Sequence, residues 1–478
     1  MAEKIPRLVI AGLSGDSGKT IVALSVLTAL KRKGFRTSVF KKGPDYIDPA
    51  WLSWASGSVC RNLDTFMVDE KDVSTTFQKH SAGFEISIIE GNRGIFDGKG
   101  EEGKHSTAEL AKLLRAPVVL VVDCTKTTRT IAAIIKGCID FDPEVNIVGV
   151  ILNKLAGKRH RNVISDSVEK YCDIPVLGAV PKFDYNKDII PGRHLGLVTP
   201  SEFESDRRLE NKLYDITEKY LNLNEIIKKA NNAKTLDSIY FKPDTEINST
   251  VKIGFFKDSV FTFYYPENLE ALRDSRAELI PISSLSDSSL PDIDGLYIGG
   301  GFPETHAAQL AENRALMGSV KSVAEKGMPI YAECGGLIYL SRSLKWNDKI
   351  FPMAGLFDID LEMSRKPMGH GYIEAEVDKK NPFFEIGTLI KGHEFHYSGP
   401  KSNFESYPTC LNIKIGSGIG GNRDGLLYKC CFAGYIHIHA TGAKKWANSF
   451  VRAALSYKDM KKKDAVIENN NNYVEVSD

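Results

Sequence analysis

Short apolar runs alternate with amphipathic segments along the first 200 residues. Continuous apolar runs separated by helical segments such as residues 19–34 are typical of parallel strands covered on both faces. The predicted strands of this half are residues 7–13, 37–43, 86–91, 116–123, 146–153 and 174–180. The pattern therefore predicts a doubly wound α/β domain over residues 1–200.

A second α/β series begins after a polar stretch. Residues 201–250 lose strand character, which predicts a helix followed by an interdomain linker. The predicted strands of the second half are residues 251–256, 277–282, 294–300, 328–333 and 431–440. We expect a second doubly wound domain over residues 251–458. The polar, asparagine-rich residues 459–478 are expected to form a disordered tail.

The composition argues against several classes of protein. Lys and Arg number 62 and Asp and Glu 61, so no net charge draws the chain to nucleic acid or to a membrane surface. No apolar run is long enough for a secretory signal or a membrane span. The eight cysteines form no C-x-x-C pair. Scattered thiols of this kind indicate a reducing compartment, and we expect the protein in the cytoplasm.

A glycine-rich turn joins the first predicted strand to the first predicted helix. In LSGDSGKT (13–20) the amides of the turn stand at a helix N-terminus, where they can cradle phosphate oxygens. The strict P-loop pattern has glycine where Leu13 stands, so an incidental glycine turn is the alternative. The strand-turn-GKT-helix order favours ATP, with Lys19 on the terminal phosphates and Thr20 on Mg²⁺. The predicted ATP-binding residues of the turn are Gly15, Asp16, Ser17, Gly18, Lys19 and Thr20.

Acidic side chains follow the ends of later predicted strands, at the edge where such sheets bind ligands. KKGPDYIDP contributes Asp45 and Asp48, and IIEGNRGIFDG contributes Glu90 and Asp97. Carboxylates beside a nucleotide hold Mg²⁺ or orient a reacting group. Each carboxylate alone is equally compatible with a solvated turn or a helix cap, but their convergence on one edge favours a site.

Cys334 lies between a predicted strand and a predicted helix in YAECGGLIYL (331–340). A free cysteine is often a small core residue, which is the alternative interpretation. A tight strand-to-helix turn instead presents a nucleophile, and a helix N-terminus favours its thiolate. Backbone amides for an oxyanion are expected from the glycines Gly299, Gly300, Gly301 and Gly335.

Two histidines in GYIHIHA (434–440) can serve such a cysteine. His437 and His439 occupy alternate positions at a predicted strand end, so both project to one face. This pair of histidines can be interpreted in two ways, as a base for the thiol or as a metal site. No carboxylate or cysteine partner has a recognisable metal-ligand spacing, which favours the base.

These motifs resemble a known family. IGGGFPETHAAQLAEN, AECGGLIYL and YIHIH, in this order, resemble a class I glutamine amidotransferase domain of the cobyrinic acid synthase type. Further motifs of the chain resemble the matching synthetase half, namely GLSGDSGKT, FKKGPDYIDPAWL, RNLDTFM, EGNRGIFDG, ILNKLAGKRH, PGRHLGL and SVFTFYYPENLEAL. The chain thus resembles the cobyrinate a,c-diamide synthase family over nearly its whole length. The resemblance implies a dethiobiotin-synthetase-like P-loop NTPase domain and a C-terminal amidotransferase domain.

The resemblance also implies a reaction. Members of such a family are ligases that amidate the a- and c-acetate carboxylates of a tetrapyrrole, using ATP, Mg²⁺ and L-glutamine, through an acyl phosphate. Cobyrinate is the expected substrate. A sirohydrochlorin-derived tetrapyrrole, such as nickel sirohydrochlorin or siroheme, is the alternative.

In the amidotransferase half, the resemblance implies that Cys334 attacks the glutamine amide and that His437 is its base. Other class I amidotransferases have a glutamate two residues after this histidine, where His439 stands here. The group that orients His437 is therefore open.

In the synthetase half, the resemblance places Asp48 and Glu90 near the metal and Asp45 and Asp97 near the substrate carboxylate. It also places Asn153 at the nucleobase.

One loop departs from the family pattern. Asn92 and Arg93 stand where an apolar pair is usual in the EGxxG loop. Arg93 can pair with a substrate carboxylate, or it can simply meet a neighbouring acid.

Two other functional classes are open. The chain can be a P-loop regulator with an inactive glutaminase half, although the intact Cys334 and His437 argue against it. A dethiobiotin-synthetase-like ligase that uses CO₂ shares the N-terminal motifs but leaves the C-terminal half unexplained. The oligomeric state is also open, with a homodimer as one possibility.

Overall fold

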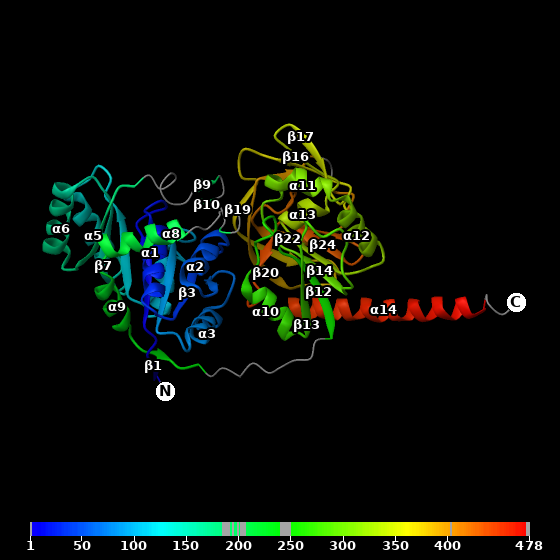
Figure 1. Ribbon diagram of the computed structural model, residues 1–478, viewed down its shortest axis with the longest axis horizontal. Helices are drawn as coiled ribbons and strands as arrows, with labels where there is room; N and C mark the ends of the chain where they lie inside the picture. Colours follow the sequence, from blue (N-terminus) through cyan, green and yellow to red (C-terminus); the bar gives the residue numbers. More distant parts are fainter. Residues whose placement is uncertain are drawn as a thin grey trace. The chain divides into compact units, whose positions relative to one another are not determined.

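The computed structural model describes residues 2–183, 192–193, 196–197, 200, 207–239, 250–401 and 404–474 (Figure 1). The chain divides into two compact units, Met1–Pro243 and Asp244–Asp478. The first unit thus extends beyond residue 200, because the helices after that point pack on it.

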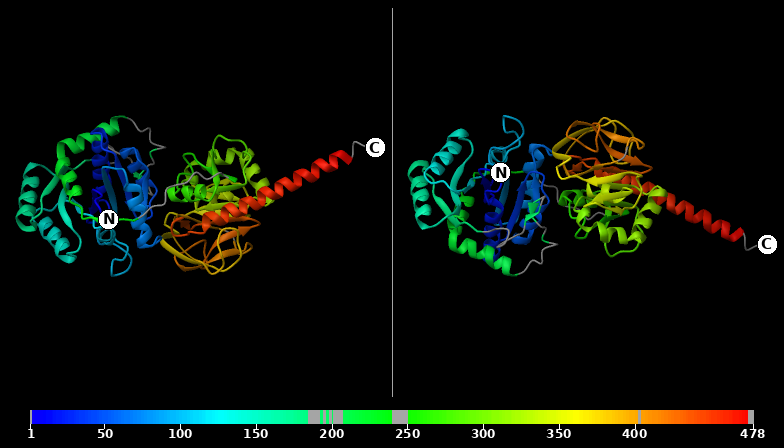
Figure 2. Two further views of the ribbon diagram at one scale, coloured as in Figure 1. Left: turned by 90° about the horizontal axis from the view of Figure 1, so that it is seen from below. Right: turned by 90° about the horizontal axis from the view of Figure 1, so that it is seen from above.

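The first unit is built on a seven-stranded parallel sheet with helices on both faces (Figures 1 and 2). In spatial order its strands are β4 (Cys60–Leu63), β3 (Thr37–Lys42), β5 (Ile86–Gly94), β2 (Arg7–Gly12), β6 (Val118–Asp123), β7 (Ile147–Leu155) and β8 (Val176–Pro181). The α/β class and the six predicted strands are confirmed. The sequence did not predict β4, because this short strand buries the polar Arg61 and Asn62.

The helices of the first unit are α1 (Lys19–Arg32), α2 (Ile47–Ser56), α3 (Glu70–Ser81), α4 (Thr107–Leu113), α5 (Thr130–Phe141), α6 (Lys158–Cys172), α8 (Arg207–Tyr220) and α9 (Leu223–Asn231). Helix α1 packs against α2 and α8, and α5 packs against α6. The small strand β1 (Ala2–Glu3) pairs with β11 (Leu236–Asp237), and β9 (Gly192–Arg193) with β10 (Gly196–Leu197). Of residues 201–250, for which the sequence predicted a helix followed by a linker, residues 201–206 and 240–249 lie outside the described residues.

The second unit contains a ten-stranded mixed sheet. Its first five strands are parallel, in the spatial order β13 (Ala277–Ile282), β12 (Val251–Phe256), β14 (Gly295–Ile298), β15 (Ile330–Glu333) and β24 (Cys431–Gly434). The sheet continues, antiparallel, through β23 (Arg423–Tyr428), β22 (Thr409–Ile415), β19 (Gly369–Val377), β20 (Leu389–His396) and β25 (His437–Ile438).

A separate four-stranded sheet contains β17 (Lys349–Pro352), β16 (Ser343–Trp346), β18 (Asp360–Met363) and β21 (Ser398–Pro400). None of the strands from β16 to β23 was among the predicted ones. They are half-buried, as the mixed exposure along β19 shows, so they lack the continuous apolar runs that marked the parallel strands.

The helices of the second unit are η1 (Pro303–His306), α10 (Pro266–Asp274), α11 (Ala307–Glu312), α12 (Arg314–Glu325), α13 (Gly335–Leu340) and α14 (Trp446–Val474). Helix α14 extends to Val474, whereas the sequence predicted a disordered tail from residue 459. The stretch from Lys458 to Lys463 carries good helix formers, which allows the helix to continue past the core.

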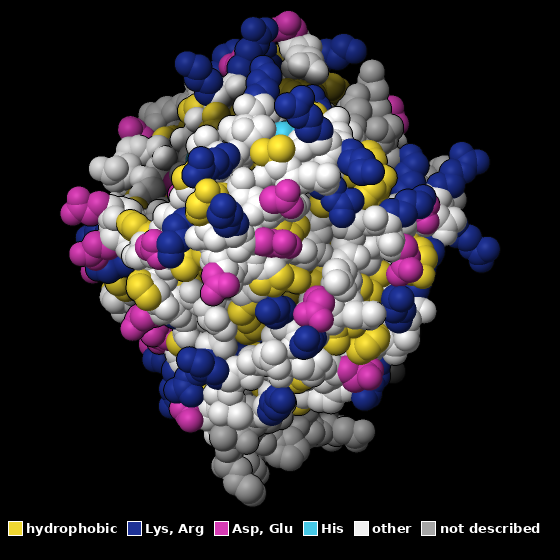
Figure 3. All heavy atoms as spheres, turned by 90° about the vertical axis from the view of Figure 1, so that its left-hand side faces the viewer, with side chains coloured by type: hydrophobic (Ala, Val, Ile, Leu, Met, Phe, Trp, Pro, Cys, Tyr) yellow, Lys and Arg dark blue, Asp and Glu magenta, His cyan; other side chains and the backbone are white. Residues whose placement is uncertain are grey.

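The surface over α5 and α6 mixes charges of both signs (Figure 3). Lys136 and Asp140 on α5, for example, form an ion pair of 2.9 Å one helical turn apart. This mixture matches the near-equal totals of acidic and basic residues. Within the described residues, no helix combines the length and the apolar character needed to cross a membrane.

Arg7 connects three segments of the first unit through hydrogen bonds. Its buried guanidinium donates to the carbonyls of Ile5 (2.7 Å), Leu114 (2.6 Å), Arg115 (3.2 Å) and Lys234 (2.5 Å). These acceptors come from the start of the chain, from the end of α4 and from the segment after α9. A buried charge satisfied by four carbonyls therefore joins segments more than 200 residues apart in sequence.

Replacing Arg7 by methionine should strongly destabilise the first unit. The substitution keeps the chain's bulk but leaves buried carbonyls without their donors, and we expect a loss of roughly 3 kcal/mol in the free energy of unfolding. The measurement is chemical denaturation followed by tryptophan fluorescence, to which Trp51 and Trp54 of the first unit and Trp346 and Trp446 of the second contribute. Arg36→Met is the matched control, because Arg36 is exposed and makes only a 3.8 Å ion pair with Glu85. Equal losses in both variants would contradict the role of the four hydrogen bonds.

Candidate functional site

The phosphate loop lies between β2 and α1. Gly18 adopts φ 86°, and no side chain caps the first turn of α1, so the amides of this turn remain available for an anion. The Lys19 side chain is buried, and its Nζ lies 3.4 Å from the Ser14 carbonyl. A side chain on Gly12 would meet Ser17 Oγ at 2.3 Å, so the close approach at position 12 requires glycine. The loop thus has a P-loop conformation although Leu13 replaces the usual glycine.

A cluster of carboxylates lies beside this loop, around the ammonium of Lys41. Lys41 Nζ is 2.5 Å from Asp48 Oδ2, 3.3 Å from Glu90 Oε1 and 3.9 Å from Asp45 Oδ2. Lys41 is the second-last residue of β3, and Glu90 lies in β5. Asp45 precedes α2, and Asp48 lies in its first turn. Parallel pairing of β3 with β5 puts Lys41 directly opposite Glu90, which explains how the two charges meet.

Burial controls the charges of this cluster. Burial raises the pKa of Glu90, and it raises that of Asp45 to about 7, with repulsion from Asp48 adding to both. Lys41 opposes these shifts. Burial alone lowers the pKa of Lys41, but Asp48 and Glu90 outweigh it, so the pKa is raised overall. The ammonium of Lys41 therefore favours the ionised form of the neighbouring carboxylates, which burial disfavours.

The cluster fits a cation bound together with a nucleotide. Thr20 Oγ1 donates to Glu90 Oε1 at 2.6 Å, while the buried Glu90 Oε2 has no hydrogen-bond partner within the described residues. Mg²⁺ typically takes one or two protein oxygens and completes its shell with phosphate and water. Thr20, Asp48 and Glu90 are the residues that could hold it. In the described part of the chain, no three His, Cys, Asp or Glu side chains form a metal-binding group by themselves.

The other predicted residues of this half lie around the cluster. Asn153 is buried beneath the phosphate loop, where its Nδ2 donates to the Ser17 carbonyl at 2.8 Å and its Oδ1 accepts from the Lys154 amide. These contacts hold the loop, and the place of Asn153 at the nucleobase stays a prediction. Asp97 Oδ2 accepts from the Gly94 amide at 2.8 Å. Arg93 is exposed near the end of β5. Burial, and to a smaller extent the charge of Arg93, lowers the pKa of Lys42.

In the second unit, Cys334 stands on a sharp turn between β15 and α13. Its backbone adopts φ 47° and ψ −92°, a strained conformation for a side chain other than glycine. Its amide donates to the Gly434 carbonyl at 2.7 Å, and its own carbonyl accepts from the Ile338 amide. Strain of this kind on a strand-turn-helix segment is the geometry of a nucleophile elbow.

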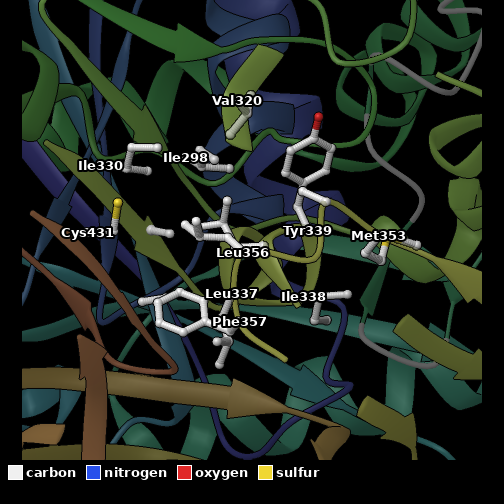
Figure 4. Close-up of a cluster of buried hydrophobic side chains, with 14 of the residues drawn as sticks. Ile298, Val320, Ile330, Leu337, Ile338, Tyr339, Met353, Leu356, Phe357 and Cys431 are labelled. Carbon is white, nitrogen blue, oxygen red and sulfur yellow. The ribbon is translucent and has the colours of Figure 1, made fainter. Parts of the chain in front are cut away.

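Helix α13 is buried along its whole length and anchors the turn (Figure 4). Leu337, Ile338 and Tyr339 pack in the same cluster as Ile298 and Ile330 of the two neighbouring strands. The apolar packing beneath Cys334 therefore holds the strained turn in place.

The glycine loop after β14 lies against this turn. A Cβ on Gly335 would meet the Gly301 amide nitrogen at 3.1 Å, and one on Gly300 would meet His437 Cε1 at 2.5 Å. The Gly299 amide donates to Tyr264 Oη at 2.8 Å. Gly299 is thus engaged in holding the loop, while Gly301 and Gly335 are the better placed donors for an oxyanion.

His437 lies on β25 with its ring stacked on His393 of β20, at 4.8 Å between centroids. Burial lowers the pKa of His437 to about 3, with His396 adding to the effect. Burial also raises the pKa of the Cys334 thiol, and Glu304 and Glu333 raise it further. Both groups are therefore neutral before substrate binds, which suits a general base that takes the thiol proton during attack.

The two histidines of the H-x-H motif have different surroundings. His439 Nε2 lies 3.5 Å from Glu267 Oε2, and its ring packs on Tyr265. His437 Nδ1 instead lies 3.8 Å from Glu333 Oε2. The metal-site interpretation of this motif thus finds no common ligand set within the described residues.

Two charged residues of these sites were missed from the sequence. Lys41 is one of two adjacent lysines at a strand end, and the pairing of β3 with β5 was needed to select it. Glu333 directly precedes Cys334, but its contact with His437 joins residues about 100 positions apart. The signal available in the sequence for Glu333 was its place directly beside the predicted nucleophile.

Two family models match the chain. Residues 8–191 match the CobQ/CobB/MinD/ParA nucleotide binding domain, and residues 252–445 match the CobB/CobQ-like glutamine amidotransferase domain.

Curated relatives match over both units. Cobyrinate a,c-diamide synthase of Magnetococcus marinus is 41% identical over 95% of this chain and 98% of its own length. The enzymes of the same name from Archaeoglobus fulgidus (40% identical, 95% of this chain and 98% of its own) and Leptospira interrogans serogroup Icterohaemorrhagiae serovar copenhageni (39%, 95% and 99%) are similar to the same extent. With both domains matched in order and almost end to end, the chain belongs to the cobyrinate a,c-diamide synthase family.

Proposed function

We propose that this protein is an ATP- and glutamine-dependent ligase that converts the a- and c-acetate carboxylates of cobyrinate into amides. The observation that carries this proposal is the presence, in one chain, of a P-loop beside a carboxylate cluster and of a strained cysteine elbow whose preceding residue, Glu333, lies 3.8 Å from a buried histidine. The two sites supply the two halves of one reaction, activation of a carboxylate and release of ammonia.

The second unit releases ammonia from glutamine. His437 takes the proton of Cys334 as the sulfur attacks the amide carbonyl carbon, and the carbonyl oxygen becomes an oxyanion. The amides of Gly301 and Gly335 stabilise this oxyanion. His437 then gives the proton to the leaving nitrogen, so ammonia departs and a γ-glutamyl thioester remains. Water hydrolyses the thioester to glutamate and restores the thiol.

The first unit activates the substrate. A carboxylate resists ammonia because its leaving group would be oxide, so its oxygen first attacks the γ-phosphorus of ATP and releases ADP. Ammonia then displaces phosphate from the acyl phosphate, and each amide costs one ATP and one glutamine. Lys19 and the loop amides bind the phosphates, and Mg²⁺ held by Thr20, Asp48 and Glu90 would neutralise their charge.

Asp45 of the cluster and two residues outside it act on the acetate groups. We assign Asp45 and Asp97 to positioning the substrate, and Arg93, exposed near the end of β5, to pairing with a carboxylate of the tetrapyrrole. We assign the protein to the cytoplasm, because all eight of its cysteines are free.

The substrate is tested by incubating the purified protein with glutamine, MgATP and either cobyrinate or nickel sirohydrochlorin. We expect the monoamide and then the a,c-diamide of cobyrinate in the mass spectrum, with ADP formed in equal amount to the amides. If only nickel sirohydrochlorin were amidated, the substrate would instead be a sirohydrochlorin-derived tetrapyrrole. ATP hydrolysis without amidation of either compound would instead indicate a P-loop regulator.

Cys334→Ser should separate the two sites. Without the thiol, glutamine-dependent amidation should fall by at least ~10²-fold, whereas amidation with ammonium chloride should continue at the wild-type rate, because the first unit is intact. The measurement is the rate of ADP release with each nitrogen source. Loss of both activities in a folded variant would contradict the division of labour.

Gly300→Ala should harm the glutaminase alone. The new methyl group would lie 2.5 Å from His437 Cε1 and displace the ring, so we expect a fall of about 10²-fold in glutaminase kcat. Gly318→Ala is the matched control, because a methyl group there, on α12, meets nothing within 4 Å. Its glutaminase rate should equal that of the wild type, and a fall in the control would show that the effect is not local.

Lys41→Met should abolish amidation with both nitrogen sources at neutral pH. Lys41 lowers the pKa values of Asp45 and Glu90, so its removal raises them and leaves the carboxylates protonated. Activity should then recover in part as the pH rises and the carboxylates ionise again. Lys112→Met is the control, because Lys112 also pairs with three carboxylates, those of Glu109, Asp142 and Glu144, away from the loop. An unchanged pH profile in Lys41→Met would contradict this role.

A further inference from the structure

The imidazole of His437 has an acidic neighbour on its Nδ1 side. Glu333 Oε2 lies 3.8 Å from this nitrogen, and both side chains are almost completely buried. Glu333 is the last residue of β15 and directly precedes Cys334. The strand that carries the nucleophile therefore also carries a carboxylate aimed at the base.

The carboxylate of Glu333 is held firmly from three strands. Tyr297 Oη of β14 donates to Oε2 at 2.9 Å, Tyr331 Oη of β15 donates to Oε1 at 3.3 Å, and the Ile438 amide of β25 donates to Oε1 at 3.2 Å. The last contact comes from the residue after His437. Glu333 thus fixes the backbone beside the base as well as facing its ring.

The residue that follows the motif, His439, has a different neighbour. Its Nε2 lies 3.5 Å from Glu267 Oε2, and its Nδ1 accepts from the Thr441 amide at 3.3 Å. His393 stacks on His437 face to face, which supports the ring plane but places no acid at Nδ1. Glu333 is therefore the acid that the fold aims at His437.

We propose that Glu333 is the positioning residue of the glutaminase site, orienting His437 through Nδ1 and stabilising its imidazolium form. The inference rests on the proposed glutaminase activity and adds a third residue to Cys334 and His437. With the Nδ1 proton directed to Glu333, Nε2 carries the lone pair that accepts the Cys334 proton.

The charge that forms during the reaction strengthens this contact. Burial raises the pKa of Glu333 to about 8. While His437 is neutral, the carboxyl group of Glu333 is therefore difficult to ionise. When His437 gains the thiol proton, its positive charge lowers that pKa again. The interaction is thus stronger in the transition state than before attack, which is the condition for accelerating the step.

Glu333→Gln tests the inference. The amide group of glutamine can donate to Nδ1 and so favour the tautomer with the proton on Nε2, which cannot act as the base. We expect glutaminase kcat to fall by about 10²-fold or more while KM for glutamine changes little. Amidation with ammonium chloride should keep its wild-type rate. Glu267→Gln is the matched control, an equally conservative change at the carboxylate beside His439, and its glutaminase rate should stay near that of the wild type.

A double substitution separates positioning from a general loss of structure. If Glu333 acts through His437, Glu333→Gln should cost nothing further in a His437→Ala background, whereas independent effects would multiply. Multiplied losses, or a rise in KM with kcat unchanged, would overturn the inference. So would a larger loss in Glu267→Gln than in Glu333→Gln. Absence of any glutaminase activity in the wild type would instead refute the proposed function itself.

Discussion

The burial of helix α13 is the constraint on which the second unit's chemistry depends. Cys334 holds a backbone conformation that costs about 1–3 kcal/mol for a residue with a side chain. A single fully buried leucine supplies roughly 2 kcal/mol, and all six residues of α13 are buried. The core beneath the turn thus offsets the strain above it. The thiol is thereby held at a fixed point between the glycine loop and the His437 strand.

In the first unit, opposite charge rather than apolar packing stabilises the candidate site. Three carboxylates would repel one another in a partly buried place, and the Lys41 ammonium lies among them at 2.5 to 3.9 Å. Removing one partner from such a buried group leaves an uncompensated charge, so the four side chains act as a unit. Thr20 connects this unit to the phosphate loop through its hydrogen bond to Glu90. The phosphate loop and the carboxylate cluster are therefore connected through adjacent side chains.

Each site joins residues that are far apart in sequence by placing them at the ends of neighbouring strands. Lys41 and Glu90 meet because β3 and β5 pair in parallel, and Cys334 meets Gly434 because β15 pairs with β24. Open parallel sheets bring reactive groups to the carboxyl edge in this way. The antiparallel extension of the second sheet adds β20 and β25, which bring His393 against His437. Both kinds of strand thus contribute to one site.

The sequence by itself determined the α/β class, the parallel strands, the phosphate loop, Cys334 and His437. These are local signals, because a buried parallel strand is a continuous apolar run and a P-loop or an elbow is a short glycine pattern. Strands β16 to β23 escaped prediction because strands that mix buried with half-buried positions, as β19 does, carry weaker apolar patterns. Only the tertiary structure decided that Lys41 neutralises the carboxylates, that Asn153 supports the loop, and that Glu333 faces His437. Those roles depend on strand register and burial, which set distances between residues that no local pattern relates.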